Sequence, residues 1–230
     1  MRKKQTLKFI CFDMDGVLVR CEGYREKSRR VGISTWNVIF DELGIYEEHE
    51  KLKKMFINGK FVSYMNWTDE ACKILKNYGL TKSIFKRIIK GRPLTKGAKE
   101  TITKLKERGY KTAVITGSFH SLAKRIKKEL NLDYAIAHCK LIFSKNGKLK
   151  FWKLLPCDFE GKLVYFNKLI NKLGLQATEC AYIGDEVNDI PIFKEVGLAI
   201  AFNPRKKEVR EAADIVVDSD DLKDILPYLR

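Results

Sequence analysis

The stretch FICFDMDGVL, residues 9–18, is the most informative part of this chain. Its apolar first half is typical of a buried β-strand, and two aspartates, Asp13 and Asp15, follow where that strand should end. Side chains at i and i+2 of a strand point to the same side, so the carboxylates repel unless a cation separates them or one is protonated. The pair is therefore compatible with a Mg²⁺ site or with a nucleophile next to a general acid/base, and equally with two solvated aspartates in a turn.

A second strand-like segment also ends in acidic residues. The run CAYIGDEVND, residues 180–189, places Asp185 and Asp189 in a loop that leads into a predicted helix. These side chains could simply cap that helix ahead of Pro191. Two acidic strand ends in one chain nevertheless favour a functional site, because parallel strands bring their carboxyl ends to one edge of a sheet.

A third strand-like segment, KTAVITGS at residues 111–118, ends in small polar residues. We expect Thr116 to offer its hydroxyl there, and Gly117 and Ser118 to offer backbone N–H groups at a helix N-terminus, which is an arrangement that binds anions. A phosphoryl group among carboxylates also needs a cation. Lys162, at the start of the helix predicted ahead of the second acidic strand, is the candidate.

Strand-like and helix-like segments alternate through most of the chain, and this order predicts an α/β fold with a parallel sheet between two layers of helices. Asn146-Gly147 predicts a hairpin over residues 141–154. Residues 17–90 are mostly helical in pattern, without a convincing strand. We therefore expect a core formed by residues 1–16 and 91–230, and a helical domain inserted after the first strand.

The composition describes a globular protein with a basic surface. The 230 residues fit one α/β domain with a modest insertion, and no apolar run approaches the length of about 20 residues that spans a membrane. The formal charge of +16 is compatible with a charge-rich solvated surface, with steering of phosphorylated substrates, or with nucleic-acid binding, in that order of preference. The six cysteines form no CxxC pair, so we expect reduced thiols and a cytoplasmic protein without a membrane partner. The oligomeric state is left open.

Four segments in this order, FDMDGVL, ITGS, Lys162 and IGDEVND, resemble the four motifs of the haloacid dehalogenase (HAD) superfamily. The resemblance covers the whole chain. The helical insertion and the hairpin at 141–154 make it most similar to phosphoserine phosphatase-like members. It implies a Rossmann-like parallel-sheet core with a C1-type helical cap at 17–90, and a phosphatase that acts on a small phosphorylated metabolite.

The resemblance also implies a role for each motif residue. Asp13 would attack phosphorus and become an aspartyl-phosphate, while Asp15 would protonate the leaving oxygen and then activate water. Mg²⁺ would be held by Asp13, by the backbone carbonyl of Asp15 and by Asp185, with Asp189 supporting this group. The phosphoryl oxygens would be bound by the remaining motif residues: Thr116, Gly117, Ser118 and Lys162.

Substrate choice would be decided by the cap, where the resemblance implies a substrate contact for Glu22. The segment at residues 65–75 offers Trp67 and Glu70 as further residues of the cap pocket. Glu70 stands near the place where phosphoserine phosphatases keep an arginine for the substrate carboxylate, so we expect a substrate other than phosphoserine. Trp67 could equally belong to the core of the cap. Two alternative functions remain open: a phosphotransferase that passes the phosphoryl group to an alcohol or sugar, and an RNA-binding or regulatory protein on an inactive HAD fold.

Overall fold

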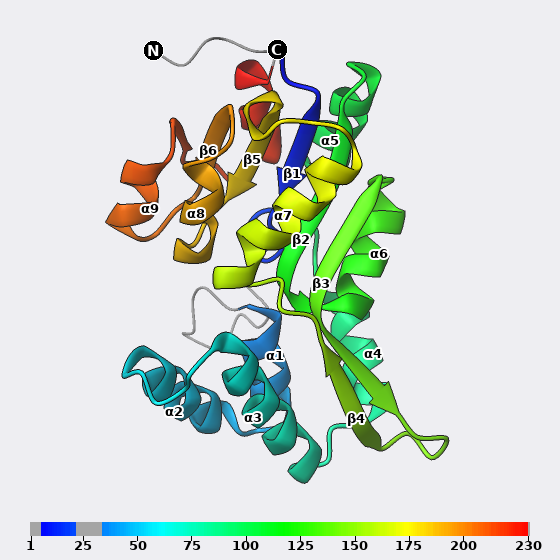
Figure 1. Ribbon diagram of the computed structural model, residues 1–230. Helices are drawn as coiled ribbons and strands as arrows, with labels where there is room; N and C mark the ends of the chain where they lie inside the picture. The colour runs from blue at the N-terminus through cyan, green and yellow to red at the C-terminus, as the bar shows by residue number, and fades with distance from the viewer. Residues whose placement is uncertain (1–5, 22–33, 230) are drawn as a thin grey trace.

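A seven-stranded sheet in the order β4-β3-β2-β1-β5-β6-β7 runs through the computed structural model, which describes residues 6–21 and 34–229 (Figure 1). The strands are β1 (Phe9–Phe12), β2 (Lys111–Phe119), β3 (Tyr134–Phe143), β4 (Leu149–Leu154), β5 (Cys180–Gly184), β6 (Leu198–Phe202) and β7 (Ile215–Val217). Neighbouring strands are parallel except in the β3–β4 hairpin. The predicted α/β fold is confirmed, with β1 at the centre of the sheet.

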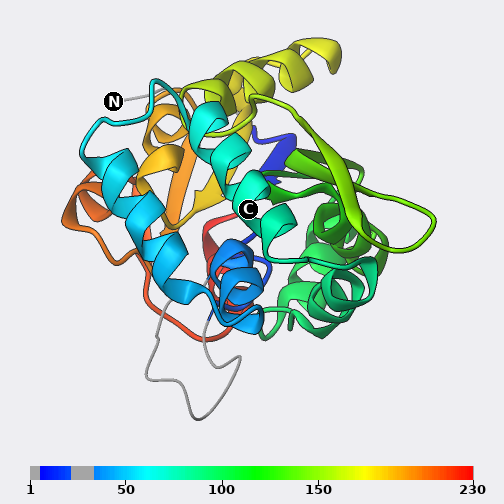
Figure 2. The same cartoon turned by 90° about the horizontal axis from the view of Figure 1, so that it is seen from below.

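Helices cover both faces of the sheet and one of its ends. They are α1 (Thr35–Glu42), α2 (Tyr46–Ile57), α3 (Tyr64–Asn77), α4 (Lys82–Gly91), α5 (Ala98–Glu107), α6 (His120–Leu130), α7 (Glu160–Lys172), α8 (Ile190–Phe193) and α9 (Lys207–Ala212), with 3₁₀ turns at Ala177–Glu179, Val187–Asp189 and Leu222–Tyr228. Helices α7 and α8 lie on one face, and α5 and α6 lie on the other (Figure 1). Figure 2 shows α1, α2 and α3 lying across the end of the sheet.

The alternation of side chains along β1 explains the two apolar layers. Phe9 and Cys11 belong to the layer beneath α7 and α8, whereas Ile10 and Phe12 belong to the layer beneath α5 and α6. All four side chains are completely buried, as expected for a parallel strand covered on both faces. The second layer continues into α1–α4, so the inserted helices share one apolar core with the sheet.

Residues 34–91 form the helices α1–α4, and the β-type contacts of the described residues near them are isolated bridges such as that between Val19 and Leu94. Ser34, Ser63 and Thr81 begin α1, α3 and α4, each with a side-chain oxygen that accepts a hydrogen bond from the backbone of the first turn. The expected helical insertion after the first strand is thus present, while its exact boundaries stay a prediction. None of the described helices combines the length and apolar character needed to span a bilayer.

Candidate active site

The turn after β1 brings the first acidic motif against the second. Asp13 continues the strand, since its backbone N–H donates to the Ile183 carbonyl of β5 over 2.8 Å. Gly16 then adopts φ +94°, a conformation that favours glycine, and a Cβ at this position would overlap the Asp185 carboxylate. The glycine therefore allows the β1 turn to lie directly on the residue that follows β5.

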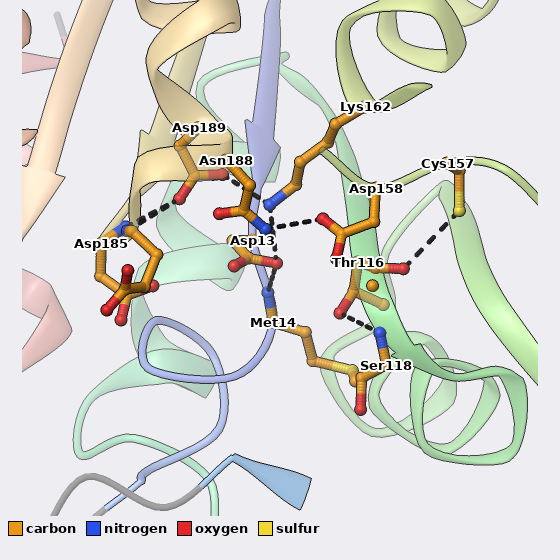
Figure 3. Close-up of polar contacts among 12 residues, drawn as sticks. Asp13, Met14, Thr116, Ser118, Cys157, Asp158, Lys162, Asp185, Asn188 and Asp189 are labelled. Atoms are coloured by element: carbon orange, nitrogen blue, oxygen red, sulfur yellow. Dashed lines mark hydrogen bonds and ion pairs between the residues drawn. The ribbon is translucent and has the colours of Figure 1, made fainter. Parts of the chain in front are cut away.

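Three carboxylates converge at this edge of the sheet (Figure 3). One oxygen each of Asp13, Asp185 and Asp189 lie within 4.8 Å of one another, which is compatible with a shared metal ion. Burial raises the pKa of Asp13, Lys162 lowers it and Asp189 raises it, and the net result is a pKa of about 8. Burial and the Asp13 charge likewise raise the pKa of Asp185 well above its usual range. A bound cation would offset this repulsion.

Lys162 is the cation of this cluster and is completely buried. Its Nζ lies 2.5 Å from Asp189 Oδ1 and 3.2 Å from Asp13 Oδ1. Burial lowers the pKa of Lys162, but the neighbouring carboxylates of Asp13 and Asp189 more than reverse this effect. The ammonium group therefore stays charged, and its hydrogen bond to Asp189 and its ion pair with Asp13 link the first and second acidic motifs.

Asp189 and Asp185 differ in how their oxygens are used. Asp189 Oδ1 accepts from Lys162 and from the Tyr182 hydroxyl, and Oδ2 accepts from the backbone N–H groups of Asp185 and Glu186. Asp185 Oδ1, in contrast, is buried and has no hydrogen-bond partner within residues 6–21 and 34–229. Asp185 is therefore better placed than Asp189 to bind a metal ion directly, since a buried unpaired oxygen is unfavourable unless a ligand satisfies it.

Asp15 lies two residues after Asp13, as the sequence requires, but its neighbours come from the inserted helices and their end. Asp15 Oδ1 accepts a 2.7 Å hydrogen bond from the Thr35 hydroxyl and lies 3.7 Å from Nη2 of the buried Arg92. Neither Thr35 nor Arg92 was identified from the sequence. They stand in no motif, and only the packing of α1 and of the segment after α4 brings them to this carboxylate.

The Thr116 segment lies at the site, but its secondary structure differs from the prediction. The strand β2 continues to Phe119, so Gly117 and Ser118 belong to the end of a strand and not to a helix N-terminus. The reason is a shift in the register of β2 against β3 after Thr116, which extends the pairing. Thr116 Oγ1 accepts from the Ser118 N–H, while the buried Ser118 Oγ has no partner in the described part of the chain.

The three substrate contacts expected in the cap have different outcomes. Trp67 is buried, stacks on Tyr64 with ring centroids 5.1 Å apart and meets the edge of Trp36, as a residue of the cap core does. Glu70 is half exposed and forms an ion pair of 3.3 Å with Lys73, so its charge is directed to the surface of α3. Glu22 lies outside the described residues.

Asp158 is a buried acidic residue of the site that sequence analysis missed. It precedes α7, and its Oδ1 accepts a 2.6 Å hydrogen bond from Nδ2 of Asn188 (Figure 3). Burial raises the pKa of Asp158, while Lys162 and the Asn188 amide lower it. The loop after β4 carries no motif that indicates this role, although Asn188 itself stands inside the GDEVND segment.

Comparisons with known proteins identify the family of the chain. A family model described as haloacid dehalogenase-like hydrolase matches residues 7–197. The phosphoserine phosphatase of Methanocaldococcus jannaschii is 34% identical over the full length of both chains, and that of Archaeoglobus fulgidus is 30% identical over 97% of this chain and 60% of its own. A substrate-bound phosphoserine phosphatase structure matches with a TM-score of 0.79, 33% identity and coverage of 98% of this chain and 100% of the other.

A structure described as a phospho-aspartyl intermediate analogue of phosphoserine phosphatase matches with a TM-score of 0.80 and 32% identity, over 98% of this chain and all of that chain. Sequence and fold agree with these relatives over nearly the whole length of the chain. The family model alone extends from the strand before Asp13 to the residues after Asp189. The chain therefore belongs to the haloacid dehalogenase-like hydrolase family and is a phosphoric monoester hydrolase.

Proposed function

We propose that the protein is a Mg²⁺-dependent phosphatase that hydrolyses a small phosphomonoester through an aspartyl-phosphate on Asp13. The observation that carries the proposal is the position of the Asp13 carboxylate, which lies between a buried lysine and two further carboxylates at the carboxyl edge of the sheet. Phosphoryl transfer requires a positioned nucleophile and neutralisation of charge, and this arrangement offers both.

The contacts of Asp13 indicate which oxygen reacts. Its Oδ1 accepts from the Met14 N–H over 2.7 Å and lies 3.2 Å from Lys162 Nζ, so we assign the attack on phosphorus to Oδ2. As the new O–P bond forms and the ester P–O bond breaks, Asp15 gives its proton to the leaving oxygen. Asp15 then takes a proton from water, which attacks phosphorus and releases inorganic phosphate and free Asp13.

The donor set fits Mg²⁺, which prefers carboxylate and carbonyl oxygens over nitrogen or sulfur ligands. We propose that Asp13, Asp185 and the Asp15 backbone carbonyl hold the ion, and that Asp189 orients the loop through its hydrogen bonds to backbone N–H groups. The unpaired buried Oδ1 of Asp185 supports this assignment among the described residues. When bound, the ion would neutralise charge on the phosphoryl oxygens. Thr116 and Lys162 complete the phosphoryl site in this proposal.

The substrate class we propose is a small phosphorylated metabolite, and phosphoserine is the first one to test. The expectation against phosphoserine depended on Glu70, whose charge is paired with Lys73 at the surface of α3 and so does not act inside the site. The similar proteins are named phosphoserine phosphatases, which favours an amino-acid phosphate. We also propose a cytoplasmic location, which the free thiols of all six cysteines support.

The test is release of inorganic phosphate from para-nitrophenyl phosphate and from phosphoserine, with Mg²⁺ or with EDTA. We expect EDTA to stop turnover and Asp13→Asn to lower kcat by at least about 10³-fold, as loss of a catalytic nucleophile does. Asp218→Asn, which changes an exposed aspartate paired with Arg210, is the matched control and should retain full activity. Equal rates for the wild type and Asp13→Asn would refute the proposal.

A further inference from the structure

The buried carboxylate of Asp158 has no role in the reaction described above, yet it lies inside the site. Only 6% of the residue is exposed, and its Oδ1 accepts the 2.6 Å hydrogen bond from Asn188 Nδ2. A Cβ added at Gly117 would overlap Asp158 Oδ2, so this carboxylate rests directly on the end of β2. Burying a further carboxyl group where a phosphoryl group must bind is unfavourable, and therefore calls for a function.

The backbone around Asp158 is held in an unusual conformation. Phe159, the next residue, has φ +43°, a backbone conformation that is unfavourable for a bulky residue and that persists only where packing enforces it. Its ring lies 5.1 Å from the Phe56 ring and 4.9 Å from the Tyr64 ring, between centroids, so α2 and α3 hold it in place. The Gly161 N–H donates to the Asp158 carbonyl over 2.9 Å. Packing from the inserted helices thus fixes the position of Asp158.

A carboxylate determines which way the Asn188 amide faces. Asn188 Nδ2 donates to Asp158 Oδ1, so the amide turns its NH₂ group towards Asp158 and its carbonyl oxygen away. Figure 3 shows this arrangement, with Nδ2 directed to Asp158 and Oδ1 directed to the opposite side. Asn188 Oδ1 is buried and has no hydrogen-bond partner among the residues that the structure describes. An unpaired buried acceptor is tolerated where a ligand later supplies the donor.

We propose that Asp158 is a positioning residue, which orients the Asn188 side chain. In this orientation the Asn188 carbonyl oxygen accepts a hydrogen bond from a donor that is present once substrate is bound. The donor is an O–H or N–H group. It belongs either to the leaving alcohol, at a position near the ester oxygen, or to the attacking water. The inference rests on the proposed phosphatase function, because it concerns the same site. It goes beyond that function because it assigns Asn188 the role of hydrogen-bond acceptor and Asp158 the role of orienting the Asn188 amide.

The test exchanges the two side chains. Asp158→Asn leaves the Asn188 amide free to turn over, and should lower kcat/KM about tenfold, the effect of one hydrogen bond in a buried site. Asn188→Asp places two carboxylates against each other and should lower kcat/KM at least as much. In the double variant D158N/N188D the new amide at position 158 donates to the new carboxylate at 188, whose second oxygen again faces the site. We expect this exchange to restore kcat/KM to within about threefold of the wild type.

Two substrates distinguish the source of the donor. The leaving group of para-nitrophenyl phosphate carries no donor, whereas phosphoserine and glycerol 2-phosphate carry O–H or N–H groups near the ester. A tenfold loss in Asp158→Asn with every substrate that is turned over assigns the donor to water, and a loss confined to the donor-bearing substrates assigns it to the leaving group. Either result supports the proposal.

Two results would overturn it: wild-type kinetics for Asp158→Asn, or a double variant no more active than the singles while its melting temperature equals that of the wild type. A contact with only a structural role would change the melting temperature, without the loss of kcat/KM in the single variants and its recovery in the double variant. Failure of the proposed function is distinguishable, since it would appear as undiminished activity of Asp13→Asn.

Discussion

Lys162→Met should destabilise the protein strongly, because Lys162 is the cation within a buried cluster of carboxylates. Its Nζ lies 2.5 Å from Asp189 Oδ1 and 3.2 Å from Asp13 Oδ1, and the side chains of Lys162 and Asp189 are both completely buried. Methionine is similar in length and keeps the apolar contacts of the lysine stem. The substitution therefore removes mainly the charge and its hydrogen bonds.

Removing one partner of a buried ion pair costs about 3–5 kcal/mol, because the other charge is left uncompensated. We expect the lower end of that range, about 3 kcal/mol at pH 7, since protonation of a carboxylate can relieve part of the repulsion. Burial, against the lowering effect of Lys162, already leaves the pKa of Asp13 raised to about 8, and loss of the ammonium group would raise this pKa further. Above about pH 8 the native variant therefore keeps a proton on Asp13 that the native wild type has lost, and the loss of stability should shrink as the pH falls from 9 to 7.

Urea denaturation followed by circular dichroism, in EDTA at pH 9 and pH 7, measures this loss. Lys207→Met is the matched control, because Lys207 forms an exposed pair of 3.3 Å with Glu211 and should cost less than about 0.5 kcal/mol. In a double-mutant cycle with Asp189→Asn, we expect a coupling free energy of about 2 kcal/mol. A loss no larger than that of the control, or strict additivity with Asp189→Asn, would refute the reasoning.

Three further predictions concern the metal site and the cap. Gly16→Ala should weaken Mg²⁺ binding at least about tenfold in calorimetric titration, because its Cβ would overlap the Asp185 carboxylate; an unchanged affinity would show that this close approach is not needed. Mg²⁺ should raise the melting temperature more at pH 8 than at pH 6, because Asp13, whose pKa burial raises to about 8, must lose its proton to bind the ion; equal shifts would exclude its carboxylate as a ligand. His138 bonds to Thr68 of α3, and burial lowers the pKa of His138 to about 4. The free energy of unfolding of the wild type should therefore fall by about 3 kcal/mol between pH 6.5 and pH 4, a loss that His138→Gln does not show. Urea curves that shift equally with pH for both proteins would contradict this.

The carboxyl ends of the strands could be predicted from the sequence because their signal is local. The segments that became β1 and β5 are apolar runs that end in aspartates, and a parallel sheet brings such ends to one edge whatever the details of packing. This reasoning placed Asp13, Asp185 and Asp189 together, and the structure has them within 4.8 Å. The alternating pattern likewise predicted the fold class, and the Asn146-Gly147 turn predicted the β3–β4 hairpin.

The residues that sequence analysis missed are brought to the site by long-range packing. Thr35 and Arg92 reach Asp15 from opposite ends of the inserted helices, and Asp158 reaches Asn188 from a loop before α7. No spacing rule relates such positions. The end of β2 was misjudged for a similar reason, because pairing with β3, and not the glycine in ITGS, determines where that strand ends. The substrate contact expected of Glu70 was inferred from its position in the sequence alone. In the structure Glu70 lies on the surface of α3, where it pairs with Lys73.

Trapping of the covalent intermediate tests the proposed chemistry most directly. The enzyme is mixed with Mg²⁺ and para-nitrophenyl phosphate, quenched in acid and reduced with borohydride, which converts a phosphorylated aspartate to homoserine that peptide mass spectrometry can locate. We predict this conversion at Asp13, and none in a sample quenched before substrate is added. Conversion at Asp15, or full turnover with no converted aspartate, would contradict a mechanism in which Asp13 attacks phosphorus.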